Sequence, residues 1–217
     1  MAESKNDAFS EVVKRLVSEM VKPSVLPSVK ANVVEAIGLQ MVKAGYEMSE
    51  WSVGVLTDYL KGYNLWLCGN PGVGKTFFFD CINTVRTARG INPIRKLSMI
   101  ETQGWTMDIA RQWTDETQCD DLLIDDVGTE PEMNSYGVKA ELFPYLLESR
   151  MGLRKRTHLT SNLGVANIKK RYGIRVIDRF VQFFKMEQYP ETVGGKKTGS
   201  RRKLAPWKVD SAGRGVL

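Results

Sequence analysis

The segment from Gly69 to Thr76 limits the possible folds of this chain more than any other segment does. It has the sequence GNPGVGKT, which fits the pattern G-x-x-x-x-G-K-[ST]. A short apolar run at 64–68 precedes it, and residues 77–89, which contain no Gly or Pro, follow it. The segment therefore joins a predicted strand to a predicted helix. Its glycines allow the backbone to approach a ligand closely, and its N–H groups with the helix N-terminus form an anion site.

These features predict a phosphate-binding loop for a nucleoside triphosphate. Lys75 can reach the β- and γ-phosphates, and the Thr76 hydroxyl can bind Mg²⁺. The alternative is a chance match within a glycine turn, which the flanking strand and helix disfavour. The predicted nucleotide contacts are Gly69, Asn70, Pro71, Gly72, Val73, Gly74, Lys75 and Thr76.

A second acidic motif follows about 50 residues later. Residues 121–126 have the sequence DLLIDD, in which three apolar residues precede Asp125 and Asp126. A buried strand would hold Asp125 at its carboxyl end, where it can bind Mg²⁺ through water, and would place Asp126 to polarise the attacking water. A strand that runs into an acidic turn is the alternative, which the distance from the phosphate loop disfavours.

A third polar position follows the predicted strand 157–160. Asn162 lies at the end of this strand, where its amide can bind the attacking water or the γ-phosphate. The alternative for Asn162 is a turn or a helix cap, both of which asparagine favours. His158, within the strand, is expected to be a core residue.

Two arginines lie further along the chain. Arg175 and Arg179 are four residues apart, so they share one face of a predicted helix. They can form ion pairs with Asp178 or Glu187, or they can reach the nucleotide of a neighbouring subunit. The residues leave both alternatives open.

The motifs, the charge distribution and the remaining periodicity together divide the chain into three predicted parts. Residues 1–50 form a helical segment that either docks a partner or packs on the main domain, residues 51–190 form a P-loop ATPase domain, and residues 191–217 form a basic tail. Trp105, Ile109 and Trp113 are spaced as a core-facing helical stripe. Pro144 is expected to kink its helix. The other predicted elements are helices at 7–20, 28–44, from Ser49 or Ser52 to Leu60, 101–113 and 137–150, and strands at 94–99 and 181–186.

Composition limits the function classes. The net charge is +6, but residues 191–217 hold seven basic and two acidic residues, so the body carries only +1. The tail is expected to be either solvated or in contact with the phosphate backbone of a nucleic acid. The three cysteines are far apart, which indicates reduced thiols, and the single histidine disfavours a multi-histidine metal site. We expect a cytoplasmic protein without a membrane span.

The motifs GNPGVGKT, LLIDDVGTE, LTSNL and RYGIRVIDRF, in this order, resemble those of the DnaC/IstB-type AAA+ ATPases, which are helicase loaders and transposition helper ATPases. The resemblance covers roughly residues 52–187. It implies a parallel five-stranded sheet with flanking helices, ATP and Mg²⁺ as cofactors, and a nucleotide held between protomers of a homo-oligomer.

The resemblance also assigns roles to single residues. Asp125 and Asp126 match the Walker B motif, and Asn162 matches sensor 1. Arg179 or Arg175 matches the arginine finger, which is supplied to the next protomer. In the tail, Arg202 matches a sensor-2 arginine that contacts the nucleotide of its own protomer.

One departure from the family concerns hydrolysis. Asp126 stands where most AAA+ proteins have Glu, and its side chain is one methylene shorter. The shorter acid predicts an ATPase whose turnover is slow, or one that uses Glu130 instead, although the DnaC/IstB-type family often has two aspartates here.

Three functions remain open at this stage. The first is a DNA replication helicase loader that places a replicative helicase on single-stranded DNA. The second is a transposition helper that binds duplex DNA and recruits a transposase. The third is a nucleotide-gated binding module with negligible turnover. The low charge of residues 1–190 favours the loader, since a protein that coats duplex DNA needs more basic surface.

Overall fold

The architecture was obtained from a computed structural model of the chain. It describes residues 31–116, 119–131, 133–135, 138–140, 142–189, 192–193, 196–197, 208–209 and 215–216. The predicted helix at 7–20 and the predicted nucleotide contact Arg202 lie outside these residues.

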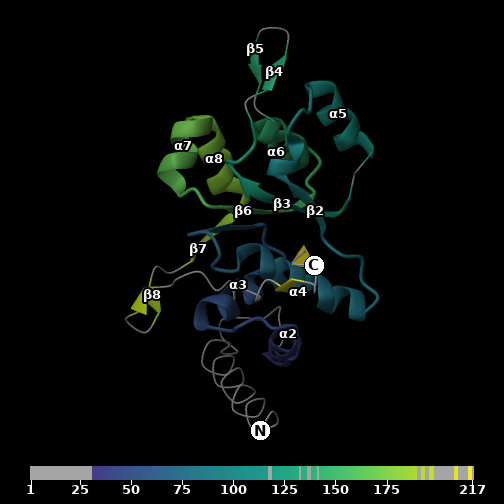
Figure 1. Ribbon diagram of the computed structural model, residues 1–217, viewed down its shortest axis with the longest axis vertical. Coiled ribbons are helices and arrows are strands. Elements are labelled where there is room, and N and C mark those ends of the chain that lie inside the picture. The colour runs from purple at the N-terminus through teal and green to yellow at the C-terminus, as the bar shows by residue number, and fades with distance from the viewer. Residues whose placement is uncertain are drawn as a thin grey trace.

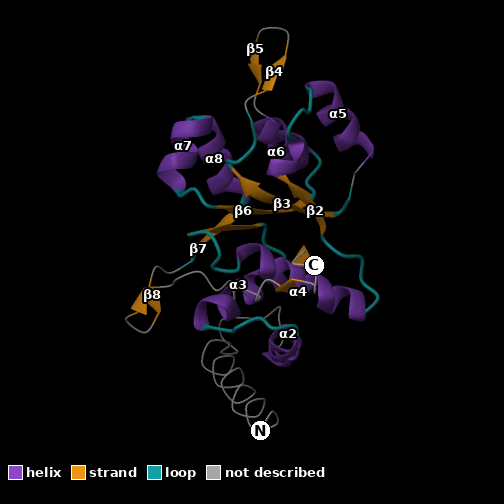
Figure 2. Cartoon of the chain, in the orientation of Figure 1, coloured by secondary structure: helices purple, strands orange, loops and turns teal. Residues whose placement is uncertain are grey.

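A five-stranded parallel sheet forms the centre of the molecule (Figures 1 and 2). Its order is β2-β3-β6-β1-β7, and every neighbouring pair is parallel. The predicted α/β P-loop NTPase fold is confirmed. The strands are β1 (Leu65–Cys68), β2 (Arg95–Ser98), β3 (Asp121–Val127), β6 (Arg156–Ser161) and β7 (Lys185–Gln188).

Helices cover both faces of this sheet (Figure 1). One face is covered by α2 (Ala31–Lys43), α3 (Glu50–Leu60) and α4 (Lys75–Ala88). The other face is covered by α5 (Met107–Glu116), α6 (Leu142–Gly152), α7 (Val165–Tyr172) and α8 (Ile174–Phe183).

Alternation along β1 explains the two hydrophobic cores. Leu65 and Leu67 join the core beneath α2, α3 and α4, whereas Trp66 and Cys68 join the core beneath the other helices. Successive side chains of a strand point to opposite faces, so a strand buried on both faces must be apolar throughout.

The segment before β1 packs as part of the domain. Val34, Ile37 and Met41 of α2 are buried in the first core. The predicted helix starting at Ser49 is confirmed as α3, because Ser49 and Ser52 form a reciprocal capping box. Thus, of the two alternatives for residues 1–50, packing applies to the described residues of α2.

Two helices begin later than predicted. The segment at 101–113 divides into a 3₁₀ turn, η1 (Met99–Thr102), and α5, because Gly104 adopts a positive φ of 83° between them. The segment at 137–150 divides into β5 (Val138–Ala140) and α6. Pro144 is the third residue of α6, so the expected kink is wrong: the N–H that proline lacks has no partner in a first helical turn.

The last predicted strand begins later than expected. Residues 181–183 continue α8, since Val176, Ile177 and Phe180 keep a helical spacing of buried residues, and β7 starts only at Lys185.

Of the predicted core-facing stripe, Trp105 and Trp113 are half-buried against the second core, but Ile109 is 44% exposed.

Short antiparallel pairs complete the described chain. They are β4 (Met133–Ser135) with β5, β8 (Thr192–Val193) with β9 (Lys196–Lys197), and β10 (Lys208–Val209) with β11 (Gly215–Val216). None of the helices in the described part of the chain is both long and apolar enough to cross a membrane.

Candidate functional site

The phosphate loop connects β1 to α4 as predicted, and Lys75 is its central side chain. Lys75 is only 5% exposed, and its Nζ donates hydrogen bonds to the carbonyl oxygens of Gly69 (2.9 Å) and Asn70 (3.0 Å). It also donates to Asn162 Oδ1 at 2.8 Å. The predicted strand-end amide and the loop lysine therefore meet, although 87 residues separate them.

Gly69 is required by a close approach of the backbone. Its φ is 148°, and an added Cβ would lie 2.8 Å from the Cβ of Tyr189. Tyr189 follows β7 and donates its N–H to the carbonyl of Cys68 at 2.8 Å, so β7 supports the loop from the side. Burial raises the pKa of the Cys68 thiol, while the charge of Lys75 opposes that shift.

Asp125 lies toward the carboxyl end of β3, close to Thr76 in the first turn of α4. The Thr76 hydroxyl donates to Asp125 Oδ1 at 2.8 Å, and the Thr160 hydroxyl donates to the same oxygen. Hydroxyl and carboxylate oxygens are the ligands that Mg²⁺ prefers, so the two residues predicted to bind the metal fit that ion. Thr160 was missed at the sequence level, because only the pairing of β3 with β6 brings it to Asp125.

A β-bulge places Asp126. Between Ile124 and Val127 the register of β3 against β6 shifts by one residue, and Asp126 adopts a left-handed φ of 57°. Its N–H donates to Thr160 Oγ1 at 2.9 Å. Bulges redirect side chains, and left-handed non-glycine residues often lie at functional sites. Here the bulge brings Asp126 to the wall of the pocket.

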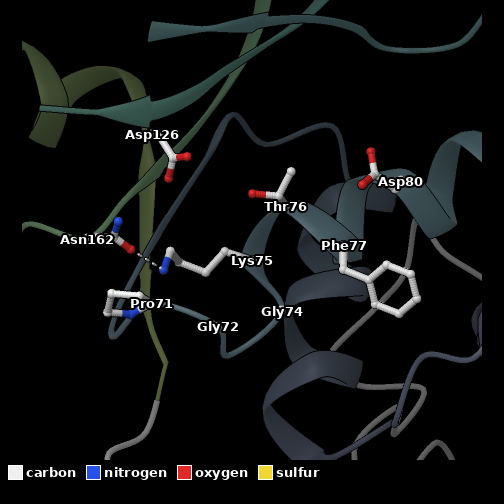
Figure 3. Close-up of a pocket in the computed structure, with 9 residues that line it drawn as sticks. All are labelled: Pro71, Gly72, Gly74, Lys75, Thr76, Phe77, Asp80, Asp126 and Asn162. Carbon is white, nitrogen blue, oxygen red and sulfur yellow. Dashed lines mark hydrogen bonds between the residues drawn. The ribbon is translucent and has the colours of Figure 1, made fainter. Parts of the chain in front are cut away.

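The pocket in front of the loop has a volume of about 400 Å³. Figure 3 shows Asp126, Asn162 and Lys75 at one end, and Phe77 and Asp80 at the other. The first turn of α4 borders it, so unpaired backbone N–H groups and the positive end of the helix dipole favour an anion there. The lining residues are Pro71, Gly72, Gly74, Lys75, Thr76, Phe77, Asp80, Asp126 and Asn162.

Glu130 is not among the residues that line this pocket. Its side chain is 4% exposed in a cluster of its own, where Oε2 accepts the N–H of Gly128 at 2.9 Å and Oε1 accepts the Tyr172 hydroxyl. Burial, and next the charge of Glu130, raise the pKa of Tyr172, so this hydroxyl stays protonated as the donor. The contacts therefore do not support the prediction that Glu130 activates water; they tie the loop after β3 to α7 instead.

Arg175 and Arg179 also lie away from the pocket. Both are exposed on α8, where they border a shallow surface hollow with Glu148, Asp178 and Gln182. Glu187, one of the acids expected as a partner, is instead near Lys185, at 3.7 Å. Neither arginine is brought to the phosphate loop of its own chain.

A second polar cluster, at the amino ends of β3 and β6, was not anticipated. Asp121 Oδ2 accepts a hydrogen bond from Arg86 at 2.7 Å, and Arg156 lies 3.8 Å from the same oxygen. His158 is fully buried, as expected of a core residue. Its Nδ1 accepts the N–H of Leu65, and its Nε2 lies 3.2 Å from Asp121 Oδ1.

The titration of this cluster follows from burial and charge. Burial lowers the pKa of His158 despite the neighbouring carboxylate. Burial acts to raise the pKa of Asp121, but the close contact with His158 and the charges of Arg156 and Arg86 outweigh it, so this pKa is lowered. The pair is therefore a neutral imidazole beside an ionised carboxylate.

No protein-family model and no curated protein sequence matches the chain. Among solved structures, it is similar to a DnaC helicase loader, with 18% identity and a TM-score of 0.48 over 67% of this chain and 94% of that one. It is also similar to AMPPCP-bound DnaA from Aquifex aeolicus, with 17% identity and a TM-score of 0.48 over 70% of this chain and 50% of that one.

A third similar structure is a protein assigned as a primosome component from Streptococcus pyogenes serotype M3. The identity is 16% and the TM-score 0.44, over 76% of this chain and 85% of that one. At such low identity and TM-score these similarities do not specify an activity.

Proposed function

We propose that the chain is an ATP-dependent loader of a replicative helicase. It binds ATP with Mg²⁺ at the phosphate loop, hydrolyses ATP slowly, and uses the nucleotide state to control its hold on single-stranded DNA and on the helicase. The observation that carries the nucleotide part is the meeting of Lys75, Asn162 and the Thr76–Asp125 pair at one edge of the sheet. The loader part rests on the four motifs and on the low charge of residues 1–190.

Each residue at this edge has a separate task in the proposal. Lys75 is held by three oxygen acceptors, so it is already oriented when the β- and γ-phosphates arrive. Thr76 and Asp125 hold Mg²⁺, which when bound would neutralise phosphate charge. Asp126 orients the attacking water, and the amide of Asn162 binds that water or the γ-phosphate.

The arginines of α8 complete the site of a neighbouring subunit in this proposal. Arg175 and Arg179 are exposed and do not border the pocket of their own chain, which favours a role across a subunit interface. We expect Arg179→Ala to leave ATP affinity unchanged and to lower turnover by about 1,000-fold. Lys170→Ala, an exposed cation on α7, is the matched control.

Mixing two defective variants tests this shared site. Lys75→Ala lacks the loop lysine but keeps Arg179, and Arg179→Ala has the reverse defect. If the arginine acts across the interface, mixed oligomers regain part of the ATPase rate. Normal turnover of Arg179→Ala alone would remove this residue from the site, and Arg175→Ala would then be measured in the same way.

The loader proposal is tested by size-exclusion chromatography with light scattering, using ATP and a replicative helicase. We expect co-elution with the full chain and none with Lys75→Ala. A chain without residues 1–30 is the useful truncation, because removing α2 as well would delete Val34 and Met41 and expose the core against which they pack. Loss of co-elution in that chain would assign the docking site to residues 1–30.

DNA separates the loader from the other two functions. The loader predicts that single-stranded DNA stimulates the ATPase more than duplex DNA does. The reverse preference, together with binding to a transposase, would indicate a transposition helper. Tight ATP binding without turnover would indicate a nucleotide-gated binding module, which the shorter acid at Asp126 would explain.

A further inference from the structure

An aromatic ring lies at the end of the pocket away from Lys75. Phe77 follows the loop threonine directly, is 43% exposed and lines the pocket. Its neighbours Phe78 and Phe79 are fully buried in the first core. A partly exposed phenylalanine contributes less to stability than a buried one, so the position of this ring calls for a functional reason.

The ring of Tyr46 packs against the ring of Phe77. The two rings are stacked at 5.9 Å with an interplanar angle of 26°, and Tyr46 is 4% exposed. Tyr46 also packs edge-on against Phe78 at 5.7 Å. A Cβ added to Gly74 of the phosphate loop would lie 3.9 Å from the tyrosine ring. The support for Phe77 is therefore built into the loop and the core.

The charged residues that line the pocket indicate how a nucleotide would be oriented in it. Lys75 lies at one end, and Asp80 lies one helical turn beyond Phe77 at the other (Figure 3). Asp80 has a partial partner in Lys96, at 3.6 Å, and both side chains are about half exposed. Among the described residues that line the pocket, Lys75 is the one cation, and the N-terminus of α4 lies beside it. A triphosphate is therefore favoured at the Lys75 end, although Asp126 lies there too, and the sugar and base then point toward Phe77.

We propose that Phe77, backed by Tyr46, is the platform on which the base of a bound nucleoside triphosphate stacks, and that Asp80 accepts a hydrogen bond from a ribose hydroxyl. This inference rests on the proposed binding of a nucleotide at the phosphate loop. Every base has a π-face, so the platform accepts all of them, but it favours purines because they offer a larger stacking area.

The test compares a ligand that has a base with one that has none. Isothermal titration calorimetry would measure Mg·ATP and Mg·tripolyphosphate binding to the full chain and to Phe77→Ala. We expect ATP affinity to fall by about 5- to 150-fold, the range for losing one base–aromatic stack. Tripolyphosphate affinity stays unchanged.

Further variants keep the test sharp. Phe77→Leu retains apolar volume without the aromatic face and should also weaken ATP binding, whereas Phe77→Trp should retain it. Ile91→Ala, a similarly exposed apolar residue that does not line the pocket, should change neither ligand.

The outcomes separate this inference from the function on which it rests. Unchanged ATP affinity in both Phe77→Ala and Phe77→Leu overturns the platform alone, and so does an equal loss of ATP and tripolyphosphate binding. A wild-type chain that binds neither ligand overturns the proposed nucleotide binding, and the platform with it.

Discussion

Strand β3 has an aspartate at each end, and the two differ in what compensates their charge. Asp121, at the amino end, is surrounded by Arg86, Arg156 and His158. Asp125, at the carboxyl end, accepts hydrogen bonds from two hydroxyl groups, and no cationic side chain of the described residues pairs with it. One cluster is complete within the chain, whereas the other can still accept a cation from solution.

This difference indicates which acid serves the fold and which serves function. A buried carboxylate needs partners, and breaking such a cluster strands the charges that remain. Hydroxyl partners satisfy the hydrogen-bonding capacity of Asp125 but do not neutralise its charge. Substitutions at the amino edge should therefore change stability, and substitutions at the carboxyl edge should change nucleotide binding and turnover.

The largest effect is expected for Lys75→Ala, at the carboxyl edge. In the proposed site Lys75 is a buried cation that contacts phosphate, so its loss should weaken ATP binding by about 1,000-fold or more. Calorimetry measures the affinity, and Lys155→Ala, which removes an exposed ion pair with Asp120, is the control. ATP binding that survives in Lys75→Ala would contradict the assignment of this edge to phosphate.

The matched pair Asp121→Asn and Asp125→Asn tests the comparison directly. Asp121→Asn leaves Arg86 and Arg156 without a buried anion, so the free energy of unfolding should fall by about 2–4 kcal/mol with ATP affinity unchanged. Asp125→Asn should change stability by less than about 1 kcal/mol but lower turnover by about 10- to 100-fold. Urea unfolding and an ATPase assay measure the two quantities.

The opposite result for these two variants would contradict the distinction between a structural Asp121 and a functional Asp125. If Asp125→Asn unfolds the chain, its carboxylate is a structural acid like Asp121. If Asp121→Asn lowers turnover at unchanged stability, the amino edge influences the site through β3.

The smallest effect concerns pH. The pKa of His158 is lowered by burial, so below the ordinary value of about 6.5 the unfolded chain takes up a proton that the folded chain does not. Stability should therefore be full above pH 6.5 and fall on acidification, by at most about 1.4 kcal/mol per pH unit. The lowered pKa of Asp121 adds a further loss below about pH 4.

Thermal unfolding between pH 5 and 8 measures this dependence. His158→Asn can still accept the N–H of Leu65 but does not titrate, so its stability should vary less over that range. An equal pH dependence in both proteins would show that another group is responsible.

Local patterns predicted much of this molecule. The glycine loop, the apolar strand before it and the acids toward the carboxyl end of β3 are signals within a few residues, and the structure brings Lys75 to Asn162 and Asp125 to Thr76. The start of α6 was not predictable in the same way. Its residues suit a helix from 137 onward, yet residues 138–140 pair with β4.

The sequence by itself determined the glycine loop between β1 and α4, the class of fold and the acids Asp125 and Asp126, because backbone freedom and hydrophobic alternation are local properties. Only the tertiary structure separated Asp121 from Asp125, moved Glu130 out of the pocket and brought Tyr46 beneath Phe77. Those outcomes depend on strand order and on contacts between residues far apart in the chain, which determine the partners that a buried charge or ring finds.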